Sequence, residues 1–223
     1  MSAPARIAVI DYGMGNRRSV EKALGHVGAT VSVTHDHDEL RAADGLVLPG
    51  VGAFPTGMDK LRSRGLDDLL RERVAVGAPV LGVCLGMQLA FASSTEHGGA
   101  EGLGIVPGPV QRLDAPDRKL PHIGWNVVSF TRDSPLRAGL PDRCAFYHVH
   151  SYAARPAEES DVLGWAEYGS VFTSVVQHGS FAGVQFHPEK SSTHGLRLLA
   201  NFVALCAPET PARDVSQPLG SGR

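Results

Sequence analysis

Short apolar runs alternate with amphipathic segments along the first half of the chain. The apolar runs are typical of parallel strands buried on both faces, whereas the segments between them carry apolar residues at helical spacing. We expect strands at residues 6–10, 29–34, 45–48 and 80–83, and helices at 16–27, within 58–76 with a break near Gly65, and directly after Cys84. This alternation predicts an α/β fold with a mostly parallel central sheet flanked by helices.

The second half of the chain has shorter runs with a different spacing. Glycine-rich residues 98–108 predict a loop, and the turn at His178-Gly179 predicts a hairpin. We therefore expect an antiparallel strand region added to the central sheet, one domain over residues 1–207, and a disordered tail over 208–223. The expected strands are 110–113, 125–130, 145–152, 162–167, 171–177 and 181–186, and a final helix over 193–206 would bury Leu196, Leu199, Ala200 and Val203.

Composition narrows the class of protein without identifying a function. The chain has 223 residues, 43% hydrophobic and 20% charged, which is enough for one α/β domain with a full core. The formal net charge is −2 and basic residues are scattered, so we expect neither a nucleic-acid nor a membrane partner. Three widely spaced cysteines form no disulfide framework. With no signal-peptide core and no apolar run near the ~20 residues of a membrane span, the sequence predicts a cytoplasmic protein.

The segment 79–90 carries the most specific chemistry. It passes from an apolar run through Gly82-Val-Cys84-Leu-Gly86 into a helix-like stretch, which is the spacing of a nucleophile elbow with cysteine as the nucleophile. Side chains two residues before and after the nucleophile would crowd so tight a turn, and glycine has no Cβ. The N-terminus of the following helix would favour the thiolate, which is the reactive form. The alternative is a buried structural cysteine at the end of a core strand.

A nucleophilic thiol needs a base, and the base needs a group that orients it. Among ten histidines, His187 stands just beyond a strand-like run and is followed by Pro188 and Glu189. In extended backbone, residues two apart face the same side, so the Glu189 carboxylate can fix the imidazole. We predict a triad of Cys84, His187 and Glu189, against the alternative that His-Pro-Glu is a solvated turn at a strand end.

Acyl transfer also needs hydrogen-bond donors for a developing oxyanion. The backbone N–H of Leu85, the residue after the nucleophile, is one candidate. The glycine loop Pro49-Gly-Val-Gly52 follows a predicted strand, and its glycines would let backbone amides approach a ligand closely. An ordinary turn at a strand end is the alternative for this loop.

Three further patterns carry less information. Gly13-Met-Gly15 follows the first predicted strand, but Arg18 replaces the third glycine of a dinucleotide fingerprint. Histidines alternate with acids at 35–39; a solvated edge explains this run better than a metal site, and we predict neither a metal nor another cofactor. His148 and His150 share one face of a predicted strand, where core packing, a metal site and a pocket wall all stay open on spacing alone.

Together these motifs resemble the class I glutamine amidotransferases, which use a Cys–His–Glu triad. The resemblance spans residues 6 to about 206, nearly the whole predicted domain. Within that family the sequence is most similar to the glutaminase subunits of imidazole glycerol phosphate synthase, because of the glycine loop and the run Pro-His-Ile-Gly-Trp-Asn. The segments that carry the likeness are 11–16, 49–54, 82–88, 121–126, 149–152 and 183–191.

The resemblance implies a reaction and a set of roles. Cys84 would attack the side-chain amide of glutamine to form a γ-glutamyl thioester, ammonia would leave, and water would release glutamate. His187 would move the proton and Glu189 would hold His187. The substrate or the oxyanion would be held by Gly52, Leu85 and Gln88, with backbone near Ser151 and Tyr152.

The resemblance also implies a separate partner, a (β/α)8-barrel cyclase. It would receive the ammonia and make imidazole glycerol phosphate and an aminoimidazole carboxamide ribotide in histidine biosynthesis. Arg17 and His148 depart from the family's usual residues near the expected interface. The isolated chain is expected to have low activity, until the partner turns an amide of the loop 49–52 toward the oxyanion. The residues expected to lie toward the partner are Asn16, Tyr147, His150 and Lys190.

Two other functions stay open on the sequence. The chain could be another triad amidotransferase subunit, serving pyridoxal phosphate, anthranilate or guanylate synthesis, although such proteins should not share the run 121–126. It could also be a binding or scaffold subunit without activity, against which the complete set of Cys84, His187 and Glu189 argues. Assays of ammonia transfer with each partner would discriminate among the amidotransferases.

Overall fold

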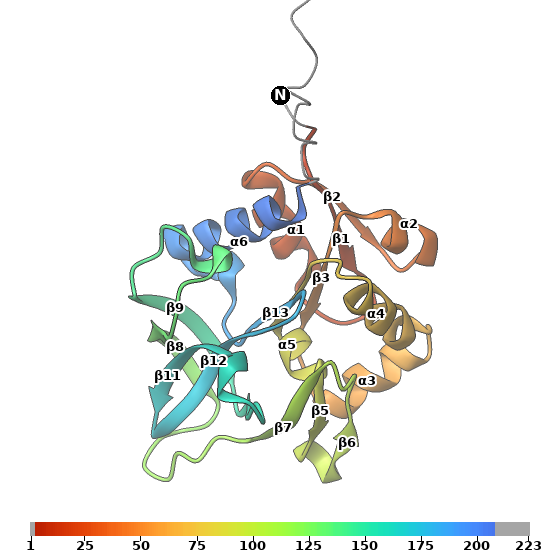
Figure 1. Cartoon of the computed structure of the whole chain (residues 1–223). Helices are drawn as coiled ribbons and strands as arrows, with labels where there is room; N and C mark the ends of the chain where they lie inside the picture. The colour runs from red at the N-terminus through yellow and green to blue at the C-terminus, as the bar shows by residue number, and fades with distance from the viewer. Residues whose placement is uncertain (1–2, 208–223) are drawn as a thin grey trace, which may run out of the picture.

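The first half of the chain alternates strands and helices in the computed structural model, which describes residues 3–207 (Figure 1). Each predicted buried run forms a strand, and each predicted amphipathic segment forms a helix. Gly65, where we expected a break, separates two helices in the left-handed conformation that glycine tolerates best. The elements are β1 (Arg6–Ile10), α1 (Arg17–His26), β2 (Thr30–Thr34), α2 (His37–Ala42), β3 (Gly45–Gly50), α3 (Phe54–Arg62), α4 (Leu66–Ala75), β4 (Val80–Cys84) and α5 (Leu85–Leu89).

The second half is made mostly of strands, as its shorter runs predict. The expected hairpin forms and turns directly after His178. The predicted loop 98–108 is only partly a loop, because it holds a two-residue strand and the start of a longer one. The elements are β5 (Phe91–Ser94), β6 (Ala100–Glu101), β7 (Val106–Arg112), β8 (His122–Phe130), β9 (Arg143–His150), β10 (Tyr152–Ala154), β11 (Val162–Tyr168), β12 (Ser170–His178), β13 (Phe181–Val184) and α6 (Ser192–Cys206).

The strands form two sheets. The larger has nine strands in the order β2-β1-β3-β4-β13-β12-β11-β8-β9, and the smaller has four in the order β10-β7-β5-β6. Pairing from β2 to β13 is parallel, and from β13 through β12, β11 and β8 to β9 it is antiparallel. This confirms the predicted α/β fold: helices flank a central mixed sheet that has parallel strands in one half and the expected antiparallel region in the other.

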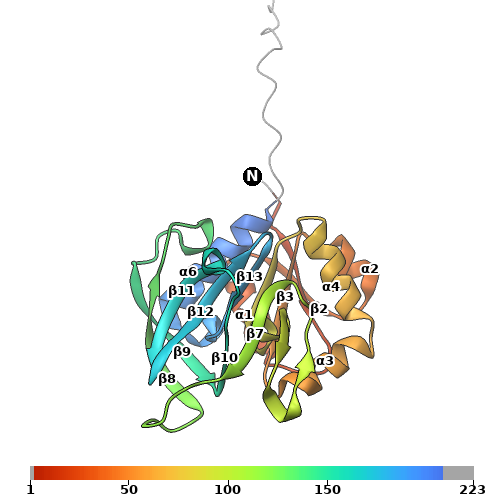
Figure 2. The ribbon, with the colours of Figure 1, turned by 60° about the horizontal axis from the view of Figure 1, so that its bottom comes forward.

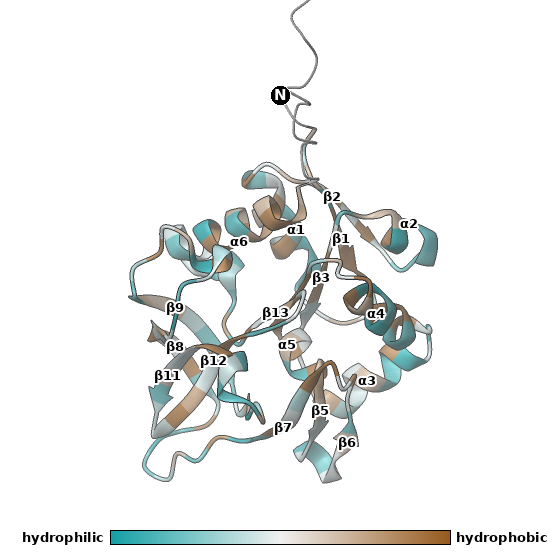
Figure 3. Cartoon of the chain, viewed as in Figure 1, coloured by the Kyte–Doolittle hydropathy of each residue, from teal (hydrophilic) through white to brown (hydrophobic). Residues whose placement is uncertain are grey.

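Helices cover both faces of the parallel part of the sheet, as Figures 1 and 2 show. On one face, α1 and α6 pack against alternate residues of β1, β3 and β4, among them Ile7, Val47 and Leu81. On the other face, α2 to α5 and the smaller sheet pack against the intervening residues, such as Ala8 and Leu46. Hydrophobic residues gather on the central strands in Figure 3, in keeping with strands buried on both sides.

The helices α5 and α6 differ in detail from expectation. The helix that follows Cys84 has only five residues, because the backbone N–H of Leu103 binds the Leu89 carbonyl and the chain turns into β5. In α6 the buried face is rotated from the expected one, since this helix packs against the turn before it and against α1. Leu199 is buried as expected, Leu196, Ala200 and Val203 are only half-buried, and the other buried residues are Gly195, Leu198, Phe202 and Cys206.

Two further sequence predictions concern the C-terminal tail and membrane-spanning helices. The predicted tail over 208–223 lies outside the described residues. Within 3–207, no helix combines the length and apolar character that crossing a bilayer requires.

Candidate active site

Cys84 stands at the turn between β4 and α5, at the centre of the sheet. Its φ of 54° and ψ of −110° are a strained backbone conformation for a residue with a side chain. A methyl group at Gly82 would lie 2.7 Å from the backbone nitrogen of Met87, and one at Gly86 would overlap the carbonyl oxygen of Leu48. The two glycines therefore make room for the elbow, for the steric reason that their spacing predicts.

Alanine at Gly86 should disrupt this elbow. We expect Gly86→Ala to lower the free energy of unfolding by about 3 kcal/mol or more, because the new methyl group collides with backbone rather than with a mobile side chain. Gly25→Ala in α1 is the matched control: a methyl group there would meet nothing within 4 Å, and alanine should stabilise that helix by about 0.5–1 kcal/mol. Urea unfolding of both variants checks the difference, and equal stabilities would contradict it.

His187 reaches Cys84 because β13 pairs in parallel with β4, with Gly183 opposite Gly82 and Val184 opposite Val83. The chain then leaves the sheet in a short turn that is fixed on both sides. The His187 backbone N–H donates to the Tyr147 carbonyl at 2.9 Å, and the Ser191 hydroxyl donates to the His187 carbonyl at 2.7 Å. Residues far apart in the sequence thus meet at the same end of two neighbouring strands.

The His187 ring lies between a carboxylate and the sulfur. Its Nδ1 is 3.0 Å from Glu189 Oε1, and the side chain of Glu189 is only 1% exposed. Burial by itself would lower the pKa of His187, but hydrogen bonding and charge interaction with Cys84 and Glu189 outweigh it and raise that pKa to about 10. The amide of Asn16 also donates to Glu189 Oε1, at 3.4 Å. The arrangement holds an imidazolium between the two groups, as a nucleophile–base–orienter set requires.

An open cavity of about 420 Å³ begins at Cys84 and His187. It is large enough for an amino-acid substrate, and the five residues predicted to hold substrate or oxyanion all line it. The side-chain amide of Gln88 is fixed there, since its Nε2 donates to the Tyr152 carbonyl at 2.9 Å. The predicted residues in the wall are Gly52, Leu85, Gln88, Ser151 and Tyr152.

The wall also holds residues that were not predicted individually, and of these only Glu96 lies outside the segments that the sequence singled out. Glu96, Val51, Pro121 and Val149 also line the cavity. The Glu96 carboxylate accepts the backbone N–H of Phe54 at 2.8 Å, so it is held in place near the glycine loop. It is the kind of group that a substrate ammonium would need. The pairing of β5 with β7 positions the strand that leads to Glu96, and no local motif signals that pairing.

The residues predicted to lie toward a partner occupy different places. Tyr147 lies on the outer side of β9, where its ring meets Trp125 at 6.2 Å between centroids. Lys190 and His150 line the cavity, and Asn16 contacts the triad carboxylate. His148, expected near an interface, is instead fully buried: its Nδ1 bonds the Phe146 carbonyl and its Nε2 bonds the Ser174 hydroxyl. His148 is buried because residues two apart along a strand face the same side, and its neighbours at that spacing on β9, Phe146 and His150, are buried too.

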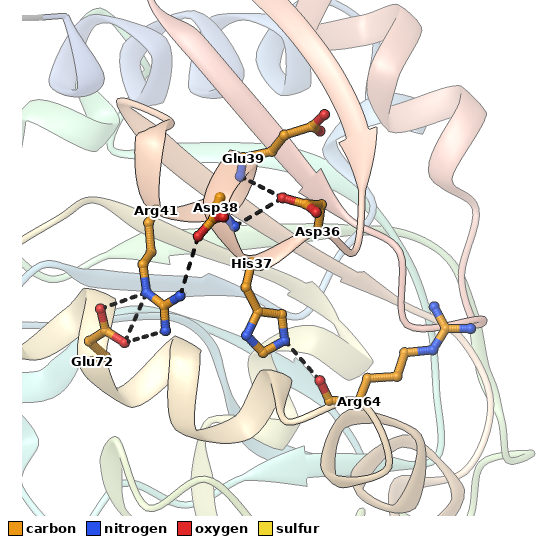
Figure 4. A network of polar contacts seen from close by, with 7 residues as sticks. All are labelled: Asp36, His37, Asp38, Glu39, Arg41, Arg64 and Glu72. Atoms are coloured by element: carbon orange, nitrogen blue, oxygen red, sulfur yellow. Dashed lines mark hydrogen bonds and ion pairs between the residues drawn. The ribbon is translucent and has the colours of Figure 1, made fainter.

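The histidine and acid run at 35–39 has structural roles (Figure 4). Asp36 caps the N-terminus of α2, accepting the backbone N–H groups of Asp38 and Glu39 at 3.0 Å each. His37 Nε2 bonds the carbonyl of Arg64 at 2.9 Å, which ties α2 to the turn before α4. Sequence reading missed this helix, although an aspartate followed by acids is a helix-start signal.

Gly13 and Gly15, which follow β1, contact other parts of the same chain. Gly13 has a φ of +82°, and its carbonyl accepts the Lys60 ammonium at 2.9 Å. Gly15 lies against the backbone of Pro49 and Gly50, so this turn packs beside the glycine loop. At the start of α1, Arg17 forms an ion pair with Asp11 and is half-buried, whereas Arg18 beside it is exposed.

Comparison with known proteins decides the family. Residues 8–206 match the family "Glutamine amidotransferase class-I". The chain belongs to the class I glutamine amidotransferases. Solved structures share its fold: a putative GMP synthase subunit from Thermoplasma acidophilum superposes with a TM-score of 0.72 at 22% identity, covering 92% of this chain and 94% of that one. This amidotransferase therefore has the fold that its motifs predict.

Curated relatives are considerably closer in sequence to this amidotransferase. The imidazole glycerol phosphate synthase subunit HisH of Moorella thermoacetica is 52% identical over 196 residues, which is 88% of this chain and 93% of the relative. The subunit of the same name from Symbiobacterium thermophilum is 52% identical over 199 residues, 89% of this chain and 93% of that one. That from Mycobacterium bovis is 50% identical over 200 residues, 88% and 96% of the two chains.

Proposed function

We infer that this amidotransferase is the glutaminase subunit of an imidazole glycerol phosphate synthase. The observation that carries the inference is a cavity lined by Cys84 and His187, with the buried Glu189 carboxylate bonded to the His187 imidazole. The 52% identity to subunits of that synthase, over nearly their full length, supports this assignment above the other triad amidotransferases. Their name makes them one subunit of a synthase, which supports the proposal that the ammonia formed here passes to a second, cyclase subunit.

The geometry supports a two-step reaction. The Cys84 thiolate attacks the δ-carbon of glutamine, and the C–N bond breaks as His187 gives its proton to the leaving nitrogen. Ammonia departs and a γ-glutamyl thioester is left on the sulfur. His187 then takes a proton from water, which adds to the thioester carbon, and the C–S bond breaks to release glutamate and restore the thiolate. Glu189 keeps the imidazole oriented throughout.

The backbone around the sulfur is suited to hold the oxyanion of both steps. Leu85 follows the nucleophile and lines the cavity, so its N–H is the first donor. The loop from Pro49 to Gly52 lies beside it, and Gly52 has a φ of +106° that favours glycine. We propose that an amide of this loop is the second donor and that it turns toward the oxyanion when the partner binds.

An exposed apolar face on β8 and β9 suits the partner. Ile123 is 59% and Trp125 56% exposed, on the same side of the sheet as Tyr147, which is opposite Trp125 in the register. Large apolar groups that face solvent together are typical of an interaction site. We propose that the cyclase, a (β/α)8 barrel, docks here and over the cavity mouth near Lys190.

Copurification with a barrel cyclase, followed by glutamine-dependent turnover, tests the function. We expect the pair to copurify and to form imidazole glycerol phosphate from glutamine. Adding the cyclase and its nucleotide ligand should raise glutaminase activity by at least about tenfold, since the second oxyanion donor is then supplied. Partner subunits of the pyridoxal phosphate, anthranilate and guanylate enzymes are the controls. Turnover with one of them, or unchanged glutaminase activity with the cyclase, would contradict the assignment.

A further inference from the structure

A second amide side chain lies beside the catalytic sulfur, and the reaction described above gives it no role. Gln185 comes directly after β13, two residues before His187, and is 0% exposed. Its Nε2 lies 3.8 Å from Cys84 Sγ, within hydrogen-bonding range for sulfur. Burying an amide among apolar strands costs free energy unless its polar atoms are bonded. A buried amide at this position therefore needs hydrogen-bond partners, and Gln185 has them in Gln88 and Cys84.

The orientation of this amide follows from its neighbours. The Tyr152 carbonyl can only accept, so it accepts a hydrogen bond from Gln88 Nε2 at 2.9 Å. The other proton of that nitrogen goes to Gln185 Oε1, also at 2.9 Å. The oxygen of Gln185 is thereby fixed toward Gln88, and its nitrogen must face the sulfur. The chain of hydrogen bonds thus has one direction, and its last member is a donor aimed at Cys84.

The Tyr152 carbonyl is itself held from a second side. His150 Nδ1 donates to it at 2.9 Å, and His150 Nε2 lies 3.0 Å from His122 Nδ1. Since His150 Nδ1 carries the proton, its Nε2 accepts and His122 Nδ1 donates. Burial lowers the pKa of His122 to about 4 and that of His150 to about 3, so both rings are neutral at neutral pH. The neutral pair fixes the carbonyl from which the amide chain starts.

We propose that Gln185 donates a hydrogen bond to the Cys84 thiolate and, together with His187, holds the nucleophile in its charged form. The bond favours the thiolate over the neutral thiol, because hydrogen bonds to charged acceptors are the stronger ones. It also favours the thiolate as leaving group when the thioester breaks down. The catalytic consequence rests on the proposed glutaminase function, whereas the bond itself does not.

Alkylation of Cys84 by iodoacetamide tests the bond without using the enzymatic reaction. The rate is measured from pH 5 to 10 on the full chain, with peptide mass spectrometry to locate the label, in Gln185→Leu and Gln185→Glu. Leucine removes the donor, while glutamate keeps an acceptor for Gln88 but removes the donor and adds negative charge. Gln177→Leu is the matched control, since that glutamine bonds Ser134 at the far end of the hairpin.

We expect the pH of half-maximal alkylation to rise by about one unit in Gln185→Leu, with an approximately tenfold lower rate below that pH, and to rise further in Gln185→Glu. Gln177→Leu should follow the wild type. The substitutions leave unchanged the other titratable groups around the sulfur and its cavity, which are Tyr12, Glu96, His150, Tyr152, His187, Glu189 and Lys190.

Two other results would be informative in different ways. Profiles of both Gln185 variants that coincide with the wild type would overturn the proposal, even if the variants were less stable, because a purely structural role changes unfolding but not the alkylation profile. If the profiles shift but the wild-type chain with cyclase does not use glutamine, the hydrogen bond stands and the proposed function fails. Circular dichroism identifies a variant that does not fold, and the other variant then decides.

Discussion

Replacing Cys84 with alanine should abolish glutamine-dependent synthesis by the complex, with a loss of at least about 10⁴-fold. Without the sulfur no thioester forms, and the remaining oxyanion donors and His187 cannot replace a nucleophile held at this turn. Synthesis from added ammonia should continue, because that route bypasses the glutaminase site. Both rates are measured on the same purified complex, one with glutamine and one with an ammonium salt.

Cys144→Ala is the control for this loss. Cys144 is also a buried free thiol, but it lies on β9 away from the elbow, and burial raises its pKa to about 11. It is therefore a protonated core residue at neutral pH, and its loss should leave glutamine use within a few-fold of the wild type. Glutamine-dependent turnover that survives in Cys84→Ala would remove the basis of the proposed mechanism.

Replacing His187 with glutamine should lower glutaminase activity by at least about 10³-fold. Glutamine can still fill the space and donate a hydrogen bond to Glu189, but it cannot carry a proton between the leaving nitrogen and water. His178→Gln is the matched control: His178 Nδ1 also bonds a carboxylate, Asp161 Oδ1 at 2.9 Å, but at the end of β12 far from the sulfur. Equal activities of the two variants would contradict the role given to His187.

The same substitution should change how stability depends on pH. The pKa of His187 is raised in the folded chain to about 10, against about 6.5 in the unfolded chain, so the folded state holds the extra proton. The resulting stabilisation is complete below about pH 6.5 and is lost as the pH rises toward 10. We expect the free energy of unfolding to fall over this window in the wild type and to fall less in His187→Gln, as urea titrations at several pH values would show.

The triad and its elbow could be predicted because each depends on residues close together in the sequence. The spacing of Gly82, Cys84 and Gly86 reports how little room the turn has, and the two-residue step from His187 to Glu189 places both side chains on one side. The alternation of strands and helices likewise predicted the parallel half of the sheet. In these places local sequence and global fold give the same answer.

The rest of the site depends on strand pairing that no local pattern contains. Glu96 reaches the cavity because β5 pairs with β7, and His150 meets His122 because β9 pairs with β8 in one particular register. Gln185 falls within a predicted strand, 181–186, and nothing in that pattern indicates that its amide faces the sulfur. Its contacts with Cys84 and Gln88 show this. These three residues thus contact partners that are distant in the sequence, and residue spacing alone could not predict those contacts.

The position of β13 has a consequence for how the protein is made. This strand joins the parallel and the antiparallel halves of the sheet, and it is synthesised well after β4, its neighbour in the sheet. At roughly 5–20 residues per second, a ribosome needs on the order of 5–20 s to proceed from the thiol to the imidazole. A nascent chain in that interval carries the nucleophile without its base, so cleavage of cellular glutamine, and the ammonia it would waste, must wait until β13 and the turn that carries His187 have been synthesised.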